Sequence, residues 1–511
     1  MTPAGQGEAG AGLVRRIVVA GGGTAGWMAA TYLNRFMRGV RGSVVLVESP
    51  AIGTIGVGEA TVPTLVHFLR QLNLDEAALM RRCSATFKLG ILFENWAREG
   101  GAYWHPFGVC GARMKGVDLF HYWNRRRRET GGSLPYSAYS LQARLAEKEL
   151  APWPYGRGSN ILETGAYALH LDAAALADHL REIATKEGVT HLRGDIRDVA
   201  LDEGGAITSL DLGEGRSVRG DLFIDATGFH GRLIEQALGD RWIDWSGHML
   251  CDRAVTCALP PSQTFPPYTR SRALEAGWRW SIPLTNRTGS GYVHSSAQVS
   301  LEEATRRFLA DAGLPEARAA DVRALNFRVG RRRHFWLRNC VSVGLSSGFV
   351  EPLESTGIHL IQKAVTRIVE HFPDLRFAAP LQRAYNEAMA HDYDEIRDFI
   401  QLHYLLTRRE EAFWRDSRHA PISDALRERI ALYDETGRID IPASHLFPET
   451  SYYFILTGND RLPRRSILEA QSEAAAQVWP ILDRLRSKAS ETIARMPSHR
   501  DYLALLHGLS P

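Results

Sequence analysis

Cysteine is scarce in this sequence and follows no ligand or disulfide pattern. The 511 residues include only five cysteines, an odd number without any C-x-x-C spacing: Cys83, Cys110, Cys251, Cys257 and Cys340. Disulfide scaffolds use an even set of cysteines, and zinc sites use paired cysteines or histidines. We therefore expect neither, and five free thiols favour a location in the reducing cytoplasm.

Long hydrophobic runs are also missing. No stretch is long and apolar enough to span a bilayer, so we expect no membrane partner. Residues 1–13 are small, rich in glycine and alanine, and lack the apolar core of a signal peptide. The sequence therefore predicts a flexible tail over residues 1–14.

Neither sign of charge predominates. Lysine and arginine total 61, aspartate and glutamate total 58, and the net charge is +3. The basic runs at 125–128 and 331–333 stand without a nucleic-acid motif or an aromatic stacking platform, which favours solvated faces. We expect no nucleic-acid partner, and the length favours two closely packed modules.

A glycine-rich turn is the first positive signal. The sequence GGGTAG at residues 21–26 follows an apolar run typical of a strand and precedes a run typical of a helix. Gly21, Gly23 and Gly26 match G-x-G-x-x-G in this strand–turn–helix setting. The first two glycines permit a tight turn and close approach to a pyrophosphate, and the third lets the helix pack on the strand.

The surroundings of this turn strengthen a dinucleotide site. Phosphates would lie at the start of the helix, beside Thr24 and Ala25, where unpaired N–H groups and the helix dipole favour an anion. Glu48 ends the next apolar run, where an acid is expected to contact the ribose. Only one such motif occurs, whereas paired flavin and nicotinamide sites would need two, so a single flavin site is favoured.

Other segments predict the outline of an α/β protein. We expect Asp172 to cap a helix that runs to about Lys186. Short strands are expected over residues 188–215, a buried strand over 221–228, paired antiparallel strands at 277–283 and 291–295, and a helix over 358–372. Residues 51–63 and 103–108 are expected to be irregular, 118–155 to wrap the surface, and the last 130 or so residues to be mostly helical.

Four segments in the same order resemble those of flavin-dependent tryptophan halogenases, from about Arg16 to the C-terminus. Besides the glycine turn, Phe87-Lys88 matches the segment with the active-site lysine of the family. Residues 277–283 match G-W-x-W-x-I-P, which separates these halogenases from ordinary flavin monooxygenases. Residues 351–357 match the segment with the catalytic glutamate and the halide-binding backbone.

The resemblance implies an α/β fold: a Rossmann-like FAD domain of the p-hydroxybenzoate hydroxylase type with an added, mostly helical substrate module. The expected division is 15–375 for the FAD module, which includes an antiparallel sheet on the substrate side. The substrate module is expected at 376–511, interleaved with 103–160. The family resemblance also implies that a separate reductase supplies FADH2 and that chloride or bromide is oxidised to hypohalous acid. It further implies that the protein forms a homodimer.

The resemblance further implies residues for the cofactor and the halide. The expected flavin contacts are Gly21, Gly23, Thr24, Ala25, Gly26, Glu48, Val57, Ala60, Ile196, Leu345 and Ile358. Thr356 and Gly357 are expected to bind the halide through their backbone. Simple helix capping is the alternative for these two residues, although helix N-termini also bind anions.

Lys88 and Glu354 are the expected catalytic residues. Lys88 lies in apolar company, and the alternative to catalysis is an ammonium that reaches water past its own aliphatic chain. In the catalytic interpretation, desolvation lowers its pKa, and the amine binds hypohalous acid or carries the halogen itself. Glu354 would then polarise the electrophile or deprotonate the cationic arene, unless it is merely a solvated acid.

Aromatic residues are expected around the tunnel and the substrate. Trp278 and Trp280 would keep substrate away from the flavin, although packing alone is the commoner role for such a pair. His105 and Phe107 match an H-x-F pair, and Tyr452-Tyr453 a tyrosine pair, that border the substrate in tryptophan-specific relatives. The small aromatic substrate is therefore expected to be an indole or another electron-rich arene.

Asn459 departs from the family pattern. It stands where tryptophan halogenases carry a glutamate for the substrate ammonium. An ammonium without a counter-charge is held poorly. We therefore expect an uncharged indole, a larger aromatic, or a substrate borne by a carrier or peptide rather than free tryptophan.

Three alternatives complete the predictions. A two-component hydroxylase would need neither Lys88 nor the segment at 277–283, and a flavin-binding protein without turnover would not keep Lys88 and Glu354. A third concerns the histidines and acids His391, Asp392, Asp394, Glu395 and His403. We expect them to be solvated or capping residues and predict no metal site.

Overall fold

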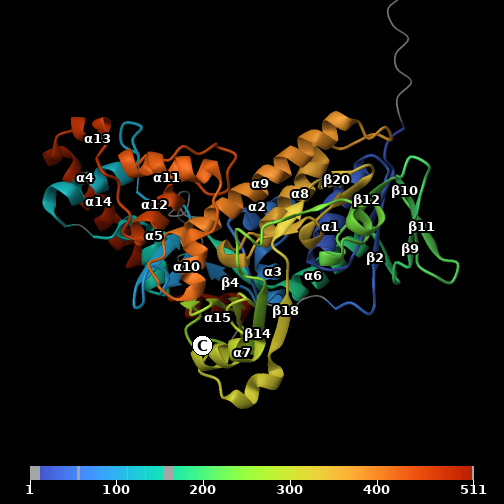
Figure 1. Cartoon of the computed structure of the whole chain (residues 1–511), viewed down its shortest axis with the longest axis horizontal. Helices are drawn as coiled ribbons and strands as arrows, with labels where there is room; N and C mark the ends of the chain where they lie inside the picture. The colour runs from blue at the N-terminus through green and yellow to red at the C-terminus, as the bar shows by residue number, and fades with distance from the viewer. Residues whose placement is uncertain (1–11, 54–57, 112, 133, 154–165, 509–511) are drawn as a thin grey trace, which may run out of the picture.

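The computed structural model describes residues 12–53, 58–111, 113–132, 134–153 and 166–508. A lobe rich in strands lies on one side of the molecule, and a mostly helical lobe lies on the other (Figure 1). Helix α9 (Ala379–Leu405) runs along both lobes and packs against helices of each.

The strand-rich lobe is organised around a parallel sheet. Its order is β20-β21-β12-β1-β2-β8, in which only β20 is antiparallel to its neighbour. The strands are β1 (Arg16–Ala20), β2 (Ser43–Glu48), β8 (Thr190–Arg193), β12 (Leu222–Asp225), β20 (Trp336–Leu337) and β21 (Cys340–Ser342). The central strands are buried along almost their whole length, which explains their continuous apolar sequences.

Helices α1 (Thr24–Gly39), α6 (Ala173–Lys186) and α8 (Gly357–Glu370) pack against one another or against this sheet. Asp172 caps α6 by accepting from the N–H groups of Ala174 and Ala175, as predicted. The long helix expected after Gly357 is also confirmed. Helix α1 begins shortly after β1, and Gly344, which follows β21, lies against Ala25 of α1 and Ile361 of α8.

A second, seven-stranded sheet carries the residues that face the helical lobe. Its order is β18-β14-β17-β16-β15-β5-β6, antiparallel except between β15 and β5. The strands are β5 (Gly90–Glu94), β6 (Ala102–Pro106), β14 (Arg253–Leu259), β15 (Thr269–Leu274), β16 (Gly277–Pro283), β17 (Thr288–His294) and β18 (Arg323–Asn326). The predicted pairing of residues 277–283 with 291–295 is confirmed by β16 and β17.

Three small sheets complete the strand-rich lobe. They are β3 (Gly58–Ala60), β7 (Ala168–Asp172) and β4 (Thr86–Lys88); β9 (Asp198–Leu201), β10 (Ile207–Asp211) and β11 (Ser217–Arg219); and β13 (Trp242–Asp244), β19 (Gly330–Arg332) and β22 (Gly348–Phe349). The first of them carries Lys88 at the end of β4.

The helical lobe combines segments from both halves of the chain. It contains α4 (Leu119–Thr130), α5 (Leu141–Glu147), α10 (Ala412–His419), α11 (Asp424–Thr436), α12 (Glu449–Gly458), α13 (Leu468–Ser472), α14 (Ala475–Ile493) and α15 (His499–His507). Helix α14 packs on α4 and α5, far from them in sequence. The remaining helices are α2 (Thr64–Gln71), α3 (Glu76–Arg82) and α7 (Leu301–Asp311).

Several local expectations were wrong. Residues 102–106 form strand β6 rather than an irregular segment, because pairing with β5 decides the conformation despite Pro106. Residues 58–60 form β3 within the expected loop, and residues 190–193 join the parallel sheet as β8. Residues 118–155 do more than wrap the surface, since α4 buries its whole first half, residues 119–124, and α5 buries one face.

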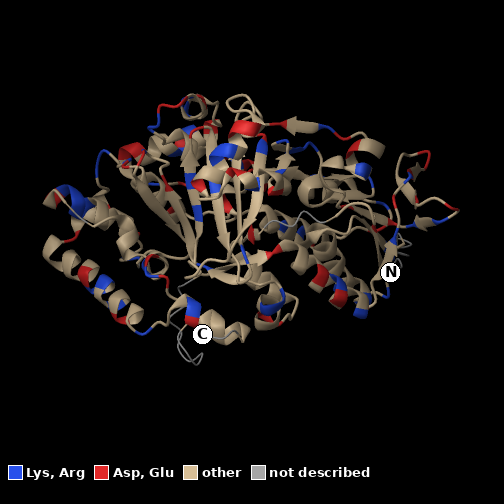
Figure 2. Ribbon diagram, turned by 90° about the horizontal axis from the view of Figure 1, so that it is seen from below, with Lys and Arg blue, Asp and Glu red and all other residues tan. Residues whose placement is uncertain are grey.

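The N-terminal segment is packed earlier than predicted. Val14 is fully buried, and Leu13 forms an isolated bridge with Asp374, so the described chain is already anchored before residue 15. Residues 1–11 of the expected tail lie outside the described residues. Basic and acidic residues are interspersed along the ribbon, as the blue and red segments show (Figure 2). Among the described helices, none combines the length and apolar character that a membrane crossing requires.

Candidate active site

Lys88 is the central group of the site and is completely buried. Its Nζ donates to the Thr61 carbonyl at 3.0 Å and to Ser355 Oγ at 2.7 Å, and it lies 4.9 Å from the centre of the Phe107 ring. Burial lowers the pKa of Lys88 to about 7, although the charge of Glu354 acts in the opposite direction. The lysine does not reach water, so an appreciable part of the amine is neutral near pH 7.

Glu354 is the second buried charge. His105 Nδ1 lies 2.8 and 3.0 Å from its two oxygens, and His403 Nε2 lies 2.9 Å from Oε1. Burial alone would raise the pKa of Glu354, but the charges and hydrogen bonds of His105 and His403 lower it to about 2. Glu354 is therefore an ionised carboxylate held between two imidazoles.

A polar chain extends from Glu354 to Asn459. His403 Nδ1 lies 2.8 Å from the Tyr103 hydroxyl, and a hydrogen bond from the Asn459 side chain lowers the pKa of Tyr103 against the larger, opposite effect of burial. The Asn459 amide also donates to the Ile455 carbonyl at 2.8 Å at the end of α12. His403 and Tyr103 thus connect Glu354 to Asn459, and the Asn459 side chain carries no negative charge.

The start of α8 follows Glu354 directly. Ser355 occupies the left-handed region with φ of +61°, and this turn brings its hydroxyl to Lys88. Thr356 does not cap α8 with its side chain, and its buried Oγ1 has no hydrogen-bond partner among the described residues. A Cβ placed on Gly357 would meet no atom within 4 Å. The side-chain capping alternative is therefore wrong for Thr356, and this N-terminus is open to an anion.

The glycine turn fits a dinucleotide by its shape. Gly21 has φ of +114°, and a Cβ there would lie 2.2 Å from the Ala226 carbonyl oxygen, so the turn crosses β12 at a distance that only glycine allows. A Cβ on Gly26 would lie 1.9 Å from the Gly21 oxygen, whereas one on Gly23 would meet nothing within 4 Å. Gly23 thus faces open space at the start of α1, which has no acid in its first turn.

Glu48 lies over this turn. A Cβ on Gly22 would meet the Glu48 carboxyl carbon at 2.3 Å, so the acid covers the middle of the glycine turn. One Glu48 oxygen lies 2.7 Å from His191 Nε2, which leaves the other oxygen available for a ribose hydroxyl. The N-terminus of α1, the glycines and Glu48 together fit the adenosine and pyrophosphate part of FAD.

Of the other expected flavin residues, Leu345 follows β21 and Ile196 follows β8, both strands of the parallel sheet. Ala25 meets Gly344, the residue before Leu345, because a Cβ on Gly344 would lie 2.7 Å from that of Ala25. Ala60 and Ile358 are buried, and Ile196 is partly buried in the loop after β8. Val57 lies outside the described residues.

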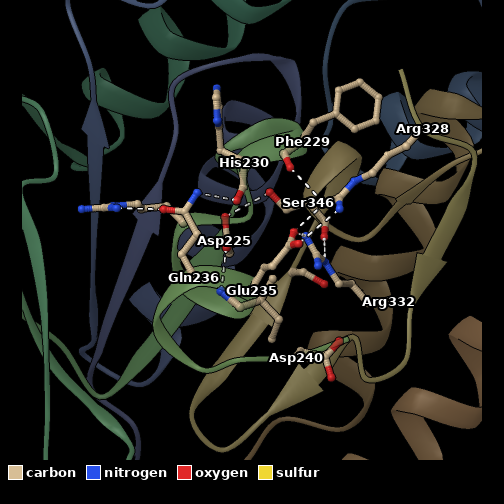
Figure 3. A network of polar contacts seen from close by, with 12 residues as sticks. Asp225, Phe229, His230, Glu235, Gln236, Asp240, Arg328, Arg332 and Ser346 are labelled. Carbon is tan, nitrogen blue, oxygen red and sulfur yellow. Dashed lines mark hydrogen bonds and ion pairs between the residues drawn. The ribbon is translucent and has the colours of Figure 1, made fainter. Parts of the chain in front are cut away.

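A polar network fixes the end of β12 beside the glycine turn (Figure 3). Asp225 accepts from the backbone N–H groups of Leu233 and Ile234 at 2.9 and 2.8 Å and from Ser346 Oγ at 3.0 Å. The buried Arg332 donates from Nε to the Ser346 carbonyl at 2.9 Å and pairs with Glu235. Both Asp225 oxygens are engaged, so this acid supports the flavin site from behind.

Trp278 and Trp280 are both buried on one face of β16. Trp278 Nε1 donates to Glu351 Oε2 at 2.9 Å, and the Trp280 ring lies over Gly291, where a Cβ would come within 2.1 Å. The two rings meet edge to face at 6.3 Å. These contacts fix the positions of both rings.

The structure brings only some of the expected substrate residues together. His105 contacts Glu354, and Phe107 contacts Lys88. Tyr452 reaches this group through Phe399, whose ring centre lies 4.9 Å from that of Tyr452 and 5.5 Å from that of His105. Tyr453 faces elsewhere and stacks at 3.9 Å on Phe120 of α4.

The histidine and acid cluster of α9 was partly misinterpreted. Asp392, Glu395 and His403 are buried rather than solvated, and each has its own partner: Arg367 for Asp392, two backbone N–H groups for Glu395, and Glu354 for His403. Within the described ranges, no group of three or more histidines, cysteines or acids is arranged to hold a metal ion.

Four further residues of the site were missed from sequence. They are Thr61, Tyr103, Ser355 and His403. No local pattern marks Thr61 or His403, because their contacts join segments far apart in the chain. Ser355 does lie in a recognisable pattern, because it belongs to residues 351–357, which match the family segment with the catalytic glutamate.

The fold and the site define a flavin-dependent enzyme with a buried lysine–glutamate centre. The chain belongs to the tryptophan halogenase family, whose model matches residues 16–474. Tryptophan 6-halogenase ThaL of Streptomyces albogriseolus is 35% identical, over 97% of this chain and 99% of ThaL. These findings identify the protein as a halogenase that uses FADH2 and halide on an aromatic substrate.

Solved structures agree with this assignment. The flavin-dependent halogenase BrvH from Brevundimonas sp. BAL3 is 39% identical, with a TM-score of 0.91 and coverage of 96% of this chain and 99% of BrvH. MibH, a lathipeptide tryptophan 5-halogenase, is 30% identical, with a TM-score of 0.81 and coverage of 96% and 94%. The predicted fold, a FAD-binding Rossmann-type α/β domain with many added helices, is confirmed.

Proposed function

We propose that this protein halogenates an indole or similar electron-rich arene, that Lys88 presents the halogen, and that Glu354 stabilises the reacting ring. The proposal rests on the burial of both groups, close enough for the Glu354 charge to act on the Lys88 amine, which donates to the adjacent Ser355. When bound, reduced FAD supplies the electrons with which dioxygen, halide and a proton yield hypohalous acid and water. The open N-terminus of α8 at Thr356 and Gly357 is the proposed halide site.

Lys88 can serve in either of two states. The ammonium donates hydrogen bonds, and the neutral amine offers a lone pair to an electrophilic halogen. A pKa of about 7 makes both forms available near neutral pH. Thr61 and Ser355 hold Nζ in place in either case, because each accepts from it.

Glu354 suits a cationic intermediate. Its pKa of about 2 keeps it ionised at every working pH, so a positive charge that develops on the arene is stabilised in a water-excluded site. The carboxylate also accepts the proton that leaves the substituted carbon, and His105 and His403 hold it in position. The arene thus loses a proton and gains the halogen, while the hypohalous oxygen leaves as water.

Free tryptophan is not the proposed substrate. Asn459 lies against Tyr103 with its amide and supplies no counter-charge for an ammonium group. The relative MibH, described as a lathipeptide tryptophan 5-halogenase, supports an indole borne by a peptide as one such substrate. We therefore propose an indole without a free amino-acid group.

We further propose a reductase partner, a cytoplasmic location and a homodimer. A separate reductase would supply FADH2, because one glycine turn of the G-x-G-x-x-G type provides one dinucleotide site. Five buried free thiols, one at each cysteine, suit a reducing cytoplasm. A homodimer remains the expected assembly.

One assay tests the proposal. The protein is supplied with FAD, a flavin reductase, NADH, air and either chloride or bromide, and it is offered indole, tryptophan and simple phenols. Product masses and halogen isotope patterns identify the reaction. We expect halogenated indole from wild type and from the surface control Lys148→Ala, and none from Lys88→Ala with flavin still bound.

The alternatives predict other results. Halide-independent hydroxylated product would favour the two-component hydroxylase. Undiminished halogenation by Lys88→Ala would remove the lysine from the mechanism. Absence of any product from wild type, with FAD bound, would favour a flavin-binding protein without turnover.

A further inference from the structure

The strand that carries Lys88 lies at the edge of its sheet. Among the described strands the order is β3-β7-β4, so β7 pairs with only one side of β4. The backbone groups along the other side need partners from elsewhere, because unpaired buried N–H and C=O groups are costly. Helix α15 lies beside β4 and supplies two of these partners (Figure 1), and the loop between β14 and β15 supplies a third.

His499 at the start of α15 bridges β4 and this loop with its two ring nitrogens. Nε2 accepts from the Phe87 N–H at 3.2 Å, and Nδ1 donates to the Phe265 carbonyl. A backbone N–H only donates and a carbonyl only accepts, so the two contacts require a neutral ring with its proton on Nδ1. The ring is fully buried, and burial lowers the pKa of His499 to about 4, which agrees with the neutral form.

Two further contacts hold the same side of β4. His507 in the last turn of α15 donates from Nε2 to the Ala85 carbonyl at 2.9 Å. The Leu89 N–H donates to the Pro267 carbonyl, in the loop between β14 and β15, at 2.7 Å. The backbone before and after Lys88 is therefore paired on this side, although no described strand lies there.

Helix α15 is itself fixed where His499 lies. The His499 N–H donates to the Glu149 carbonyl at 2.9 Å. Tyr502, one turn further on, packs its ring on that of Phe87, with 5.8 Å between the ring centres. His499 thus ties β4 to a helix that lies beyond residues 16–474, the part of the chain that the family model matches.

The position of β4 decides where the Lys88 amine lies. Phe87, the residue before Lys88, lies opposite Leu169 of β7. The Leu169 carbonyl accepts from the Thr61 N–H at 3.0 Å, and the Thr61 carbonyl accepts from Lys88 Nζ at 3.0 Å. A shift of β4 against β7 therefore moves Nζ away from its acceptor. Misplacement of a reacting group by about 1 Å can cost roughly 10²-fold in rate.

We propose that His499 is a positioning residue for halogenation, because it fixes the strand from which Lys88 extends. His507, whose ring is only partly buried, holds the same strand and contributes less. This inference rests on the proposed function, in which Lys88 presents the halogen. It adds the C-terminal helix α15 to the parts of the chain on which the rate of halogenation depends.

Two substitutions of His499 separate positioning from the mere filling of space. His499→Phe keeps a ring of similar size and removes both hydrogen bonds, whereas His499→Gln carries one acceptor and one donor that can replace them. Halogenation of indole is measured with FAD, reductase, NADH and halide. We expect kcat of His499→Phe to fall roughly 10- to 100-fold while KM for indole stays within about twofold of wild type. His499→Gln should recover most of the lost kcat.

A measurement without flavin or substrate accompanies the kinetics. Hydrogen exchange followed by mass spectrometry reports on the backbone N–H groups of residues 85–89 in the flavin-free protein. We expect exchange there to be roughly tenfold faster in His499→Phe than in wild type, the effect of about one buried hydrogen bond, with no change in β1. His121→Phe is the matched control, because this buried ring packs on Phe120 in the helical lobe; its kcat and its exchange should equal those of wild type.

The outcomes separate this inference from the proposed function. Wild-type kcat or unchanged exchange at residues 85–89 in His499→Phe would each overturn the positioning role, as would a His499→Gln protein as slow as His499→Phe. Undiminished halogenation by Lys88→Ala would instead overturn the proposed function, and the exchange result would stand. If His499→Phe does not fold, His507→Phe decides the question, and we expect it to show faster exchange at residues 85–89 and a lower kcat.

Discussion

Two glutamates at the two ends of one short turn have opposite properties. Glu351 precedes and Glu354 ends the 3₁₀ turn η6 (Pro352–Glu354), and they are 0% and 1% exposed. Burial raises the pKa of Glu351 to about 7, whereas the charges and hydrogen bonds of His105 and His403 overcome burial and lower that of Glu354 to about 2. At pH 7 the same residue at the same depth is thus about half protonated at position 351 and ionised at position 354.

The difference lies in the partners. Glu351 accepts from the Trp278 indole at 2.9 Å and from the Tyr404 hydroxyl at 2.8 Å, both of which are neutral. Neutral donors do not overcome the cost of burying a carboxylate, whereas imidazoles that can carry charge do. Burial therefore does not by itself assign a catalytic acid, and the neighbouring charges must be known. Glu351 holds the Trp278 ring by a hydrogen bond, and Glu354 is the proposed catalytic carboxylate.

We expect the largest effect, on kcat, when each of the two glutamates is replaced by glutamine. Glu354→Gln removes the charge beside the arene, and we expect kcat to fall roughly 10²–10⁴-fold. Glu351→Gln keeps the oxygen that accepts from Trp278 and Tyr404, and kcat should remain within about threefold, the scale of one neutral hydrogen bond. Steady-state halogenation of indole at saturating halide measures both. Equal losses in the two variants would contradict the division of roles.

The next effect concerns stability against pH. The pKa of Glu351 is about 7 in the folded protein, against an ordinary value of 4.5. The protonated acid therefore contributes to the free energy of unfolding below pH 4.5, and this contribution is lost as the pH rises towards 7. The loss amounts to roughly 3 kcal/mol. Compared with wild type, Glu351→Gln should therefore gain stability from pH 4.5 to pH 8.

Urea unfolding at several pH values measures this difference. Other buried groups titrate in both proteins alike, so the wild-type value minus that of Glu351→Gln isolates Glu351. A difference that is flat between pH 5 and 8 would show that Glu351 is already ionised in the folded protein. Glu354 has the opposite sign: its contribution is present above pH 4.5 and is lost as pH falls towards 2.

A smaller effect is expected where the turn meets Lys88. Ser355→Ala removes an acceptor 2.7 Å from Nζ, which disfavours the ammonium, and the pKa of Lys88 should fall by about one unit or less. We expect the midpoint of the wild-type pH–rate profile near pH 7, and Ser355→Ala should move it to lower pH. Ser347→Ala, whose buried hydroxyl donates to Ser342 instead, is the control and should leave the midpoint unchanged. An unmoved midpoint in both would mean that Lys88 does not set the profile.

Sequence predicted those parts of the site that lie within continuous segments. The glycine turn, the paired tryptophans and the stretch from Glu351 to Gly357 each carry their chemistry in a few adjacent residues. Strand β6 was missed because Pro106 and Gly108 indicate a turn, whereas pairing with β5 and burial of Tyr103 and His105 decide the structure.

Long-range contacts could not be predicted in this way. His403 comes from the far end of α9, and only tertiary packing brings it to Glu354. The pKa of each glutamate follows from such contacts, so the sequence could name the two acids but not their charges.

The smallest effects are expected from a matched pair of tyrosines. Tyr103→Phe removes the hydroxyl 2.8 Å from His403 Nδ1, and Tyr404→Phe removes the hydroxyl 2.8 Å from Glu351. Each change costs one buried hydrogen bond, about 1 kcal/mol of stability. Only Tyr103→Phe frees the His403 ring to adopt the other tautomer, so kcat should fall several-fold there and by less than twofold in Tyr404→Phe. Thermal unfolding and indole kinetics on the two proteins decide the matter, and equal rates would place His403 outside the reaction.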